Sequence, residues 1–255
     1  METDGTKVLI SVKRYLPSRP EPFYQTYELR FNDDLTVLDA LNELKDSQDA
    51  SLTFRWSCRM GICGSCSAIV NGKPVLMCQT YVKDLKHPVR VEPLRNFPVI
   101  KDLVVDIDDA FEKMRGTMPY VTRMKQKALE DGEYIQTPEQ LEKIKQSSQC
   151  IKCMLCYSAC PVYGQDKNFI GPAAGALAYR YQADNRDEGK DKRIDGVTGK
   201  KGVWNCSFVG ECSVVCPKRV DPALALQRLK LMGALRLGKK IANAIAGRPS
   251  AAEVI

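Results

Sequence analysis

The stretch CIKCMLCYSACP, residues 150–161, contains four cysteines separated by two, two and three residues, and it closes with a proline. The whole chain has 255 residues and 11 cysteines. Its opening residues, METDGTK, lack the basic and then apolar pattern of an export signal, so we expect a reducing compartment. Reduced thiols in odd number do not indicate a disulfide scaffold, and the spacing therefore points to metal binding.

A run with this spacing is typical of bacterial ferredoxins, in which thiolates hold an iron–sulfur cluster. In two-cluster ferredoxins the last cysteine of each run binds the cluster of the other run. A second run is present in CSFVGECSVVCP, residues 206–217, but Val209 stands where its second cysteine would lie. Exchange of the last ligands gives one set of four thiolates and one set of three: Cys150, Cys153, Cys156 and Cys216; and Cys160, Cys206 and Cys212.

The two ligand sets predict different clusters. Four thiolates hold a 4Fe-4S cube, whereas three thiolates with an apolar side chain at the fourth corner favour a 3Fe-4S cluster. An alternative stays open, in which Val209 is a core residue and water or another ligand completes a second 4Fe-4S cube. Zinc fits this half poorly, because seven cysteines cannot form two four-thiolate sites and the only histidine is His87.

A third group of cysteines lies near the N-terminus, in SCRMGICGSC, residues 57–66. The spacing of four and then two residues is that of plant-type ferredoxins, which hold a 2Fe-2S cluster. The turn Asn71-Gly72 predicts a tight hairpin that returns the fourth cysteine to the group. The predicted ligands are Cys58, Cys63, Cys66 and Cys78. Zinc is the alternative, although structural zinc sites usually use two CxxC knuckles.

The hydrophobic pattern changes along the chain. Alternation over residues 8–12 and 23–31 predicts two strands, and helical spacing of leucines after Thr36 predicts a helix. From about residue 104 the pattern is helical, with helix starts marked at Thr137-Pro138, Gly171-Pro172 and Asp221-Pro222. The predicted class is α+β: a β-grasp, plant-type ferredoxin domain (residues 1–104) and an all-α, two-cluster ferredoxin domain (residues 105–255).

Other function classes find little support. We see no GxGxxG loop, no P-loop and no Ser/His/Asp set, so the chain has no sign of substrate chemistry of its own. The net charge of +7 is spread among acidic residues, which argues against nucleic-acid binding. No apolar run reaches the roughly 18 residues needed to cross a bilayer, so membrane contact is expected to be peripheral.

The motifs quoted above, together with FIGPAA (residues 169–174), resemble the iron-sulfur subunit of succinate dehydrogenase and fumarate reductase over residues 7–236. This resemblance implies an electron-transfer subunit of a succinate:quinone oxidoreductase or quinol:fumarate reductase at the cytoplasmic face of a bacterial inner membrane. A flavoprotein subunit containing FAD would meet the N-terminal domain, and a membrane anchor with quinone would meet the C-terminal one. Electrons would pass through the 2Fe-2S, 4Fe-4S and 3Fe-4S centres in that order.

The resemblance also implies part of a quinone site, at Pro161, Ser207, Gln227 and Lys230. Ubiquinone-linked relatives carry a Trp after the first Cys-Pro and a His after the next cysteine, where this chain has Gly164-Gln165 and Ser207. That difference favours menaquinone and the fumarate reductase branch.

Two other functions compete with this one. The iron-sulfur component of a thiol-linked fumarate reductase, or of a glycolate-oxidase-like complex, shares both ferredoxin halves. Such proteins usually continue into a domain with Cys-Cys-Gly motifs, whereas this chain has no cysteine after Cys216. A zinc-dependent nucleic-acid-binding module would use the positive charge but leaves the number of cysteines unexplained.

Overall fold

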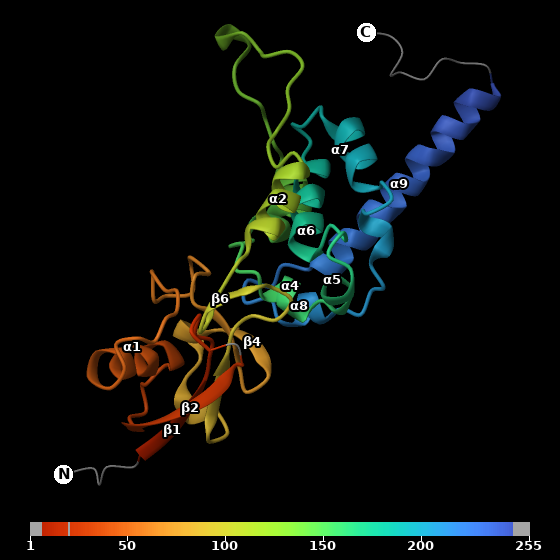
Figure 1. The fold of residues 1–255 in the computed structure, drawn as a ribbon. Helices are drawn as coiled ribbons and strands as arrows, with labels where there is room; N and C mark the ends of the chain where they lie inside the picture. Colours follow the sequence, from red (N-terminus) through yellow and green to blue (C-terminus); the bar gives the residue numbers. More distant parts are fainter. Residues whose placement is uncertain (1–6, 20, 247–255) are drawn as a thin grey trace.

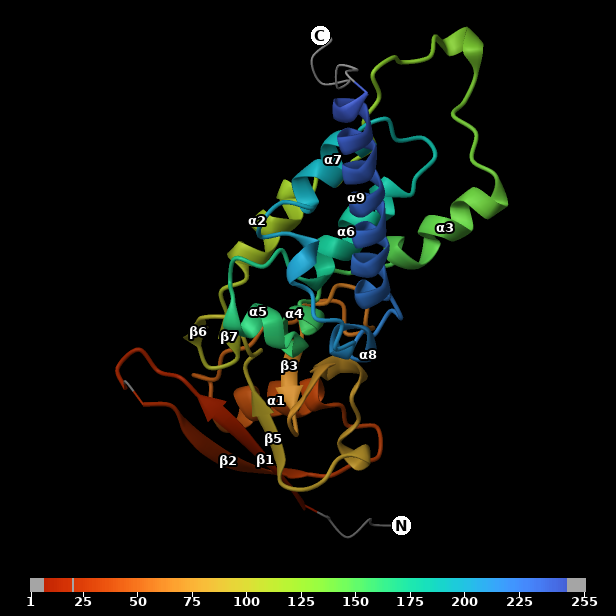
Figure 2. The same ribbon diagram turned by 90° about the vertical axis from the view of Figure 1, so that its right-hand side faces the viewer.

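The structure, a computed structural model, describes residues 7–19 and 21–246. A sheet with one packed helix forms one end of the molecule, and a group of helices forms the other (Figure 1). In the view turned by 90°, the cysteine-bearing segments around α4, α5 and α8 lie between the sheet and the longer helices (Figure 2). The expected limits of the two domains at residues 1 and 255 fall outside the described residues.

The main sheet is mixed, with the strand order β2-β1-β5-β3-β4. Its strands are β1 (Lys7–Arg14), β2 (Phe23–Arg30), β3 (Ser67–Val70), β4 (Lys73–Leu76) and β5 (Val89–Glu92). β1 pairs antiparallel with β2 and parallel with β5, and β3 pairs antiparallel with β4 and β5. Helix α1 (Val37–Ser47) buries its apolar side in the core beneath this sheet.

Local sequence signals explain most of this half. Val8, Ile10 and Val12 alternate into the core on β1, as predicted, because neighbouring side chains of a strand point to opposite faces. The predicted helix begins after Thr36, whose hydroxyl accepts the N–H of Asp39. Asn71 and Gly72 form the predicted hairpin with φ of 46° and 82°. Strand β5 was not predicted, although the short alternation Val-Arg-Val-Glu carries the signal.

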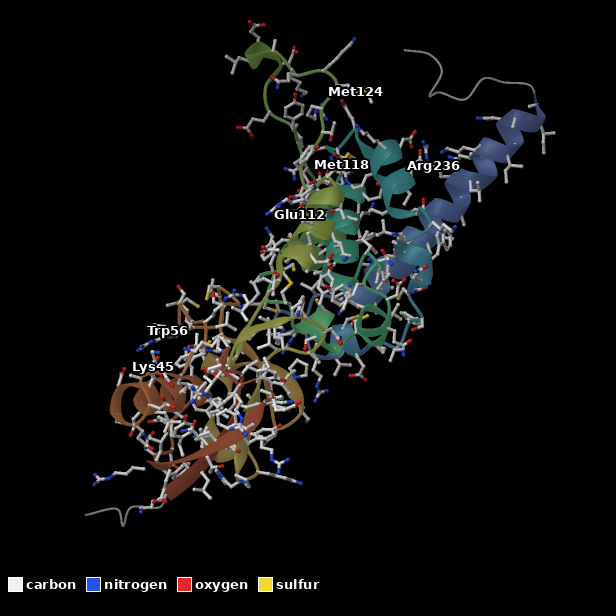
Figure 3. All side chains as sticks on the ribbon, in the orientation of Figure 1. Lys45, Trp56, Glu112, Met118, Met124 and Arg236 are labelled. Atoms are coloured by element: carbon white, nitrogen blue, oxygen red, sulfur yellow. The ribbon has the colours of Figure 1, made fainter. Side chains whose placement is uncertain are left out.

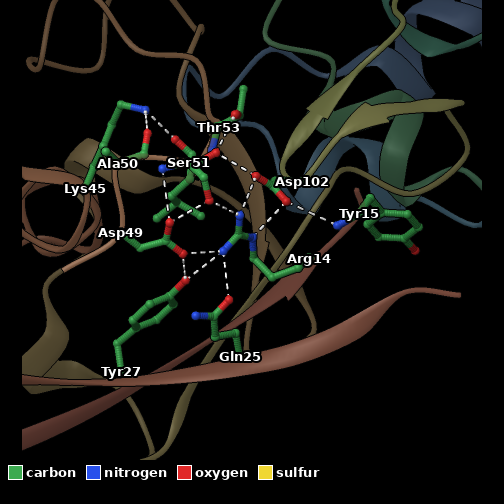
Figure 4. Close-up of polar contacts among 11 residues, drawn as sticks. Arg14, Tyr15, Gln25, Tyr27, Lys45, Asp49, Ala50, Ser51, Thr53 and Asp102 are labelled. Carbon is green, nitrogen blue, oxygen red and sulfur yellow. Dashed lines mark hydrogen bonds and ion pairs between the residues drawn. The ribbon is translucent and has the colours of Figure 1, made fainter. Parts of the chain in front are cut away.

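A buried arginine ties several segments of this half together (Figure 4). Arg14, at the end of β1, is 1% exposed, and its guanidinium donates to Asp49, Ser51 and Asp102. Asp102, in the turn between β6 (Val99–Lys101) and β7 (Val104–Val105), also accepts the backbone N–H of Thr53 at 3.0 Å. The network therefore anchors the segment that leads into the first cysteine loop.

From residue 108 onward, the described chain is helix and loop. The helices are α2 (Asp108–Gly116), α3 (Pro138–Ser148), α4 (Leu155–Ala159), α5 (Pro161–Gln165), α6 (Pro172–Gln182), α7 (Lys190–Val197), α8 (Glu211–Val214) and α9 (Pro222–Ile245). Short 3₁₀ turns are η1 (Met77–Gln79), η2 (Val82–Asp84), η3 (Leu129–Asp131) and η4 (Val203–Asn205). Between α2 and α3 the chain projects away from the body (Figure 1).

All three marked helix starts are confirmed. Thr137 and Gln140 form a reciprocal capping box at α3, and α6 begins at Pro172 after Gly171. At α9, the carboxylate of Asp221 accepts the N–H of Leu224. The small β6–β7 hairpin was not predicted, because strands of three and two residues are too short to show an alternating pattern.

The two halves share one continuous apolar core. At the junction, Phe97 packs against Tyr157 and Tyr163, with ring centroids 6.3 Å and 5.8 Å apart. The amide of Asn96 donates to the backbone carbonyl oxygens of Tyr157, Ser158 and Cys160. Within the ranges 7–19 and 21–246, no helix has the length and apolar character needed to span a membrane.

Candidate metal centres

The first cysteine loop folds around the sulfur of Cys58. Backbone N–H groups of Met60, Ile62 and Cys63 point to this sulfur, with N···S distances of 3.5, 3.3 and 3.3 Å. Positive φ angles at Arg59, Gly61 and Gly64 produce this curl. Inward-pointing N–H groups stabilise anionic sulfur, as ferredoxin-type loops require.

The hairpin brings Cys78 next to Cys66. The N–H of Met77 donates to the carbonyl oxygen of Cys66 at 3.0 Å, which seats η1 and Cys78 against the end of the loop. Burial raises the pKa of Cys66 to about 12, and the adjacent Cys78 contributes to that rise. The pKa of Cys63 is lowered to about 6, mainly by a backbone hydrogen bond from Cys58 and then by hydrogen bonds from Ser65. The structure thus gathers all four predicted thiols.

A cavity in the helical half is lined by four of the seven remaining cysteines: Cys150, Cys153, Cys156 and Cys216. Three of these thiols come from the loop before α4 and from α4 itself. Cys216 comes from the other run, directly after α8, and lies close enough to Cys150 to raise its pKa. The segments 150–156 and 216–222 therefore wrap one space between them.

A neighbouring cavity is lined by the other three cysteines, Cys160, Cys206 and Cys212. Val209 also lines it, together with Pro161 and Ser207. The N–H of Tyr163 points to the sulfur of Cys160 at 3.4 Å. The last cysteine of each run is thus next to the other run's cysteines.

The two cysteine runs have the same backbone shape. Lys152 and Met154, two and four residues after Cys150, have φ of 56° and 65°. Phe208 and Gly210, at the same offsets from Cys206, have φ of 59° and 89°. Each run then enters a short helix, α4 or α8. Val209 consequently occupies the place in its loop that Cys153 occupies in the other.

The thiols of the helical half are suited to a metal cluster. Burial raises the pKa of Cys150, Cys160, Cys153 and Cys212, the last two to about 11 and 12, and that of Cys156 well above its ordinary value. A buried thiolate needs nearby positive charge, which bound iron supplies. In residues 7–19 and 21–246, no three or more His, Cys, Asp or Glu side chains meet where one metal ion would sit. The sulfurs of these cysteines instead line the two cavities described above.

The four residues expected to form a quinone site cluster around Cys206. Pro161 and Ser207 line the three-cysteine cavity. The amide of Gln227 lies 3.7 Å from the sulfur of Cys206, and the ammonium of Lys230 donates to the carbonyl oxygen of Cys206 at 2.7 Å. Both side chains come from α9, whose orientation the Asp221 cap helps to set.

Two features of the sites were missed by sequence reasoning. Gly64 of the first loop lies against Cys153 of the second, in a contact between segments far apart in the sequence. Apolar side chains beside the first loop are exposed: Trp56 by 42%, Met60 by 67% and Ile62 by 55%. Figure 3 shows Trp56 at the sheet end of the molecule, far from Met124 on the projecting segment. Arg59 covers the Trp56 ring at 4.4 Å.

One group of cysteines lies in a plant-type ferredoxin loop, and two groups are formed by a pair of bacterial-type runs. This arrangement defines the class of protein: a two-domain iron-sulfur electron carrier. Residues 9–112 match the family "2Fe-2S iron-sulfur cluster binding domain", and residues 146–220 match "4Fe-4S dicluster domain". The predicted α+β class is confirmed by these matches and by the sheet and helices described above.

Relatives extend over most of the chain. The fumarate reductase iron-sulfur subunit of Mycobacterium tuberculosis is 52% identical over 92% of this chain and 96% of its own length. The succinate dehydrogenase iron-sulfur subunit of Coxiella burnetii is 35% identical over 86% and 94%. The solved Sdh1 complex of Mycobacterium smegmatis in the apo form contains a chain with a TM-score of 0.83 and 30% identity, covering 91% of this chain and 97% of that one.

The chain belongs to the family of fumarate reductase and succinate dehydrogenase iron-sulfur subunits. It is therefore an electron-transfer subunit of an oxidoreductase complex. Members of this family carry a 2Fe-2S, a 4Fe-4S and a 3Fe-4S cluster, as predicted. The higher identity to the fumarate reductase subunit agrees with the predicted branch. The thiol-linked and glycolate-oxidase-like alternative is not favoured.

Proposed function

We propose that this chain relays single electrons between a flavoprotein subunit, where succinate and fumarate interconvert, and quinone at a membrane anchor. The observation that carries the proposal is the sorting of 11 cysteines into three neighbouring groups of four, four and three. The clusters supply one-electron transfer without atom transfer. The protein's part is to hold the thiolates and fix the spacing of the groups.

We assign the ligands as follows: Cys58, Cys63, Cys66 and Cys78 to 2Fe-2S; Cys150, Cys153, Cys156 and Cys216 to 4Fe-4S; Cys160, Cys206 and Cys212 to 3Fe-4S. The two thiol-lined cavities support the last two sets. The matching backbone of the two runs supports the three-iron assignment, because Val209 offers no ligand atom where Cys153 offers a sulfur. We place the domain boundary near residue 104, before the first helix of the second half.

The end that carries the first loop is the proposed docking site for the flavoprotein, which contains FAD. Cys63 is exposed there, so its loop reaches the surface of this chain. Trp56, Met60 and Ile62 surround it with exposed apolar area, which is the composition of a protein interface core. A partner seated on this patch would come close to the first metal centre.

The surface around the three-cysteine cavity is the proposed quinone and membrane-anchor side. Pro161 and Ser207 line the three-cysteine cavity, and the Lys230 ammonium lies beside Cys206. A lysine at this place can donate to a quinone oxygen and stabilise the negative charge that develops there. Gly164-Gln165 and Ser207 favour menaquinone, and the expected location is the cytoplasmic face of the bacterial inner membrane.

Electron paramagnetic resonance of the anaerobically purified complex tests the proposal. The oxidised sample should show a three-iron signal, and stepwise reduction should reveal two further centres. Metal analysis should give about 9 irons per chain, the sum of two, four and three. A protein containing zinc and no iron would exclude the assignment. If signals from three iron centres are detected but none is a three-iron species, the proposed electron transfer stands and the role of Val209 is overturned.

A further inference from the structure

Gly64 lies where the first and second cysteine loops touch. It follows Cys63 directly in the sequence and has φ of +72°. A Cβ atom placed on Gly64 would lie 2.8 Å from Cβ and 2.9 Å from Cα of Cys153, and 3.1 Å from the carbonyl oxygen of Ile151. Distances this short between carbon atoms are strongly repulsive, and the atoms involved belong to or adjoin the backbone of the second loop. No side chain larger than hydrogen fits without moving one of the loops.

The surroundings of this contact are open. A cavity of about 300 Å³ lies beside it, lined on one side by Cys63, Gly64 and Ser65 and on the other by residues 151–154. The apolar wall of the cavity includes Phe54, Leu103 and Phe111. Gly64 therefore provides a direct backbone contact between the two loops at the edge of a region where they are separated.

The junction around this contact is firmly held. The backbone N–H of Arg95 donates to the Ser158 hydroxyl at 2.9 Å, and the Asn96 amide donates to three carbonyl oxygens at the end of α4. The packing of Phe97 on Tyr157 and Tyr163 adds apolar contact. The two halves cannot move apart at low cost, so an added methyl group would have to displace the loops themselves.

We propose that Gly64 is a positioning residue that sets the separation of the first and second metal centres. Because it has no side chain, the loop that carries Cys63 rests on the backbone at Cys153. One electron can then leave the centre on the Cys63 side and enter the centre on the Cys153 side, or the reverse, with no movement of protons or atoms. The inference rests on the ligand assignment of Cys63 and Cys153 made above.

Gly61 provides a matched control within the same loop. Its φ is +70°, so substitution by alanine carries the same local strain as at Gly64. The three atoms nearest to a Cβ on Gly61 all belong to the flexible side chain of Gln79, and the nearest is its Cγ at 2.9 Å. G61A and G64A therefore differ mainly in whether the new methyl group presses on the second loop. Asparagine tolerates positive φ best among residues with a side chain, so G61N and G64N form a second pair with less strain.

The test uses the purified complex and measures the magnetic interaction between the reduced first and second centres. The dipolar part of this interaction falls with the cube of their separation. We expect the broadening of the 2Fe-2S signal by the reduced second centre to be unchanged in G61A and clearly weakened in G64A. Electron transfer between the two centres, measured by rapid freezing, should also be slower in G64A.

The outcomes separate this inference from the proposed function. If wild type lacks either of the two centres, the ligand assignment fails. If G64A contains both centres and its magnetic interaction equals that of wild type and G61A, the assignment stands and the role of Gly64 is refuted. Loss of the first centre in both G64A and G64N would mean that Gly64 is needed for the folding of its own loop, and this result would also refute the positioning role.

Discussion

Arg14 and Asp102 stand 88 positions apart in the chain, yet the Nε of Arg14 donates to Oδ1 of Asp102 at 2.8 Å, and the Asp102 carboxylate is fully buried. Burial alone would lower the pKa of Arg14, but its hydrogen bonds to Asp102 and Asp49 raise that pKa above its ordinary value. The pair joins β1 to the β6–β7 turn and, through Thr53, to the first cysteine loop.

Replacing Asp102 with alanine should destabilise the chain by about 3 kcal/mol, because a buried guanidinium would lose its main partner. Urea denaturation monitored by circular dichroism measures the decrease in the free energy of unfolding. Glu28→Ala is the control: Glu28 on β2 pairs with Lys7 on β1, but both side chains are exposed, so the expected cost is within about 1 kcal/mol. Equal losses in the two variants would contradict a special role for the buried pair.

Asp184 is a buried carboxyl paired with Arg180 and Arg186, and we expect it to make the stability of the helical half depend on pH. Burial would raise the pKa of this carboxyl, but hydrogen bonds from Arg186 and Arg180 outweigh burial and hold it well below its usual range. A carboxyl whose pKa is lower in the folded state than in the unfolded state stabilises the fold at pH values above its unfolded pKa, about 3.9. This contribution is lost as the pH falls from the unfolded pKa through the folded-state pKa.

The wild type should therefore lose stability on acidification below about pH 4 more steeply than Asp184→Asn, which lacks the titrating group. The measurement is the urea midpoint as a function of pH for both chains. Asp33→Asn, at an exposed position, serves as control and should follow the wild type. An Asp184→Asn profile parallel to the wild type would show that this carboxyl contributes nothing on the acid side.

Val209→Cys should place a thiolate where the repeated loop shape puts Cys153 in the other run. We expect the three-iron signal to disappear and the iron content to rise from about 9 to about 10 per chain. The potential of that centre should fall, which would slow electron flow to quinone. Val214→Cys is the control, since Val214 is 79% exposed on α8 and does not line the cavity. Retention of the three-iron signal in Val209→Cys would mean that the new sulfur does not reach the site.

Lys230→Leu should reduce quinone-linked turnover by about 10- to 100-fold, because one donor to the developing charge is removed. Succinate oxidation by an artificial dye, which bypasses quinone, should be preserved. Lys239→Leu, at an exposed place farther along α9, should leave both activities unchanged. A similar loss in the quinone and dye assays would instead assign Lys230 to the structure around Cys206, whose carbonyl oxygen it contacts.

Signals that act over a few residues were readable from the sequence. The Asn71-Gly72 hairpin and the cap at Thr137 depend only on neighbouring residues. The spacing of the Cys-Pro motifs predicts that the last cysteine of each run lies beside the other run's cysteines, and the two cavities have that arrangement. Contacts between distant segments were not readable. No local pattern places Gly64 against Cys153 or Arg14 against Asp102, because tertiary packing decides which residues meet.

Asn96 is the residue that most directly connects the two halves. It has φ of 70°, and its amide nitrogen lies 3.0 to 3.1 Å from the carbonyl oxygens of Tyr157, Ser158 and Cys160. Those carbonyls end α4, the helix that carries Cys156 and leads to Cys160. The amide therefore adds side-chain hydrogen bonds at the end of α4, where the carbonyl oxygens of Tyr157 and Cys160 also accept a backbone N–H.

Asn96→Asp isolates this contribution, because aspartate has the same shape and also tolerates positive φ but turns a carboxylate toward three carbonyl oxygens. We expect a loss of about 1–3 kcal/mol and faster hydrogen exchange over residues 157–164, with exchange in the β1–β2 pair unchanged. Asn168→Asp is the control: Asn168 is exposed, and its side-chain oxygen, which an aspartate retains, accepts from Lys201. Uniformly faster exchange in both halves would mean that Asn96 supports the whole fold, and unchanged exchange at 157–164 would mean that the three hydrogen bonds do not hold the end of α4.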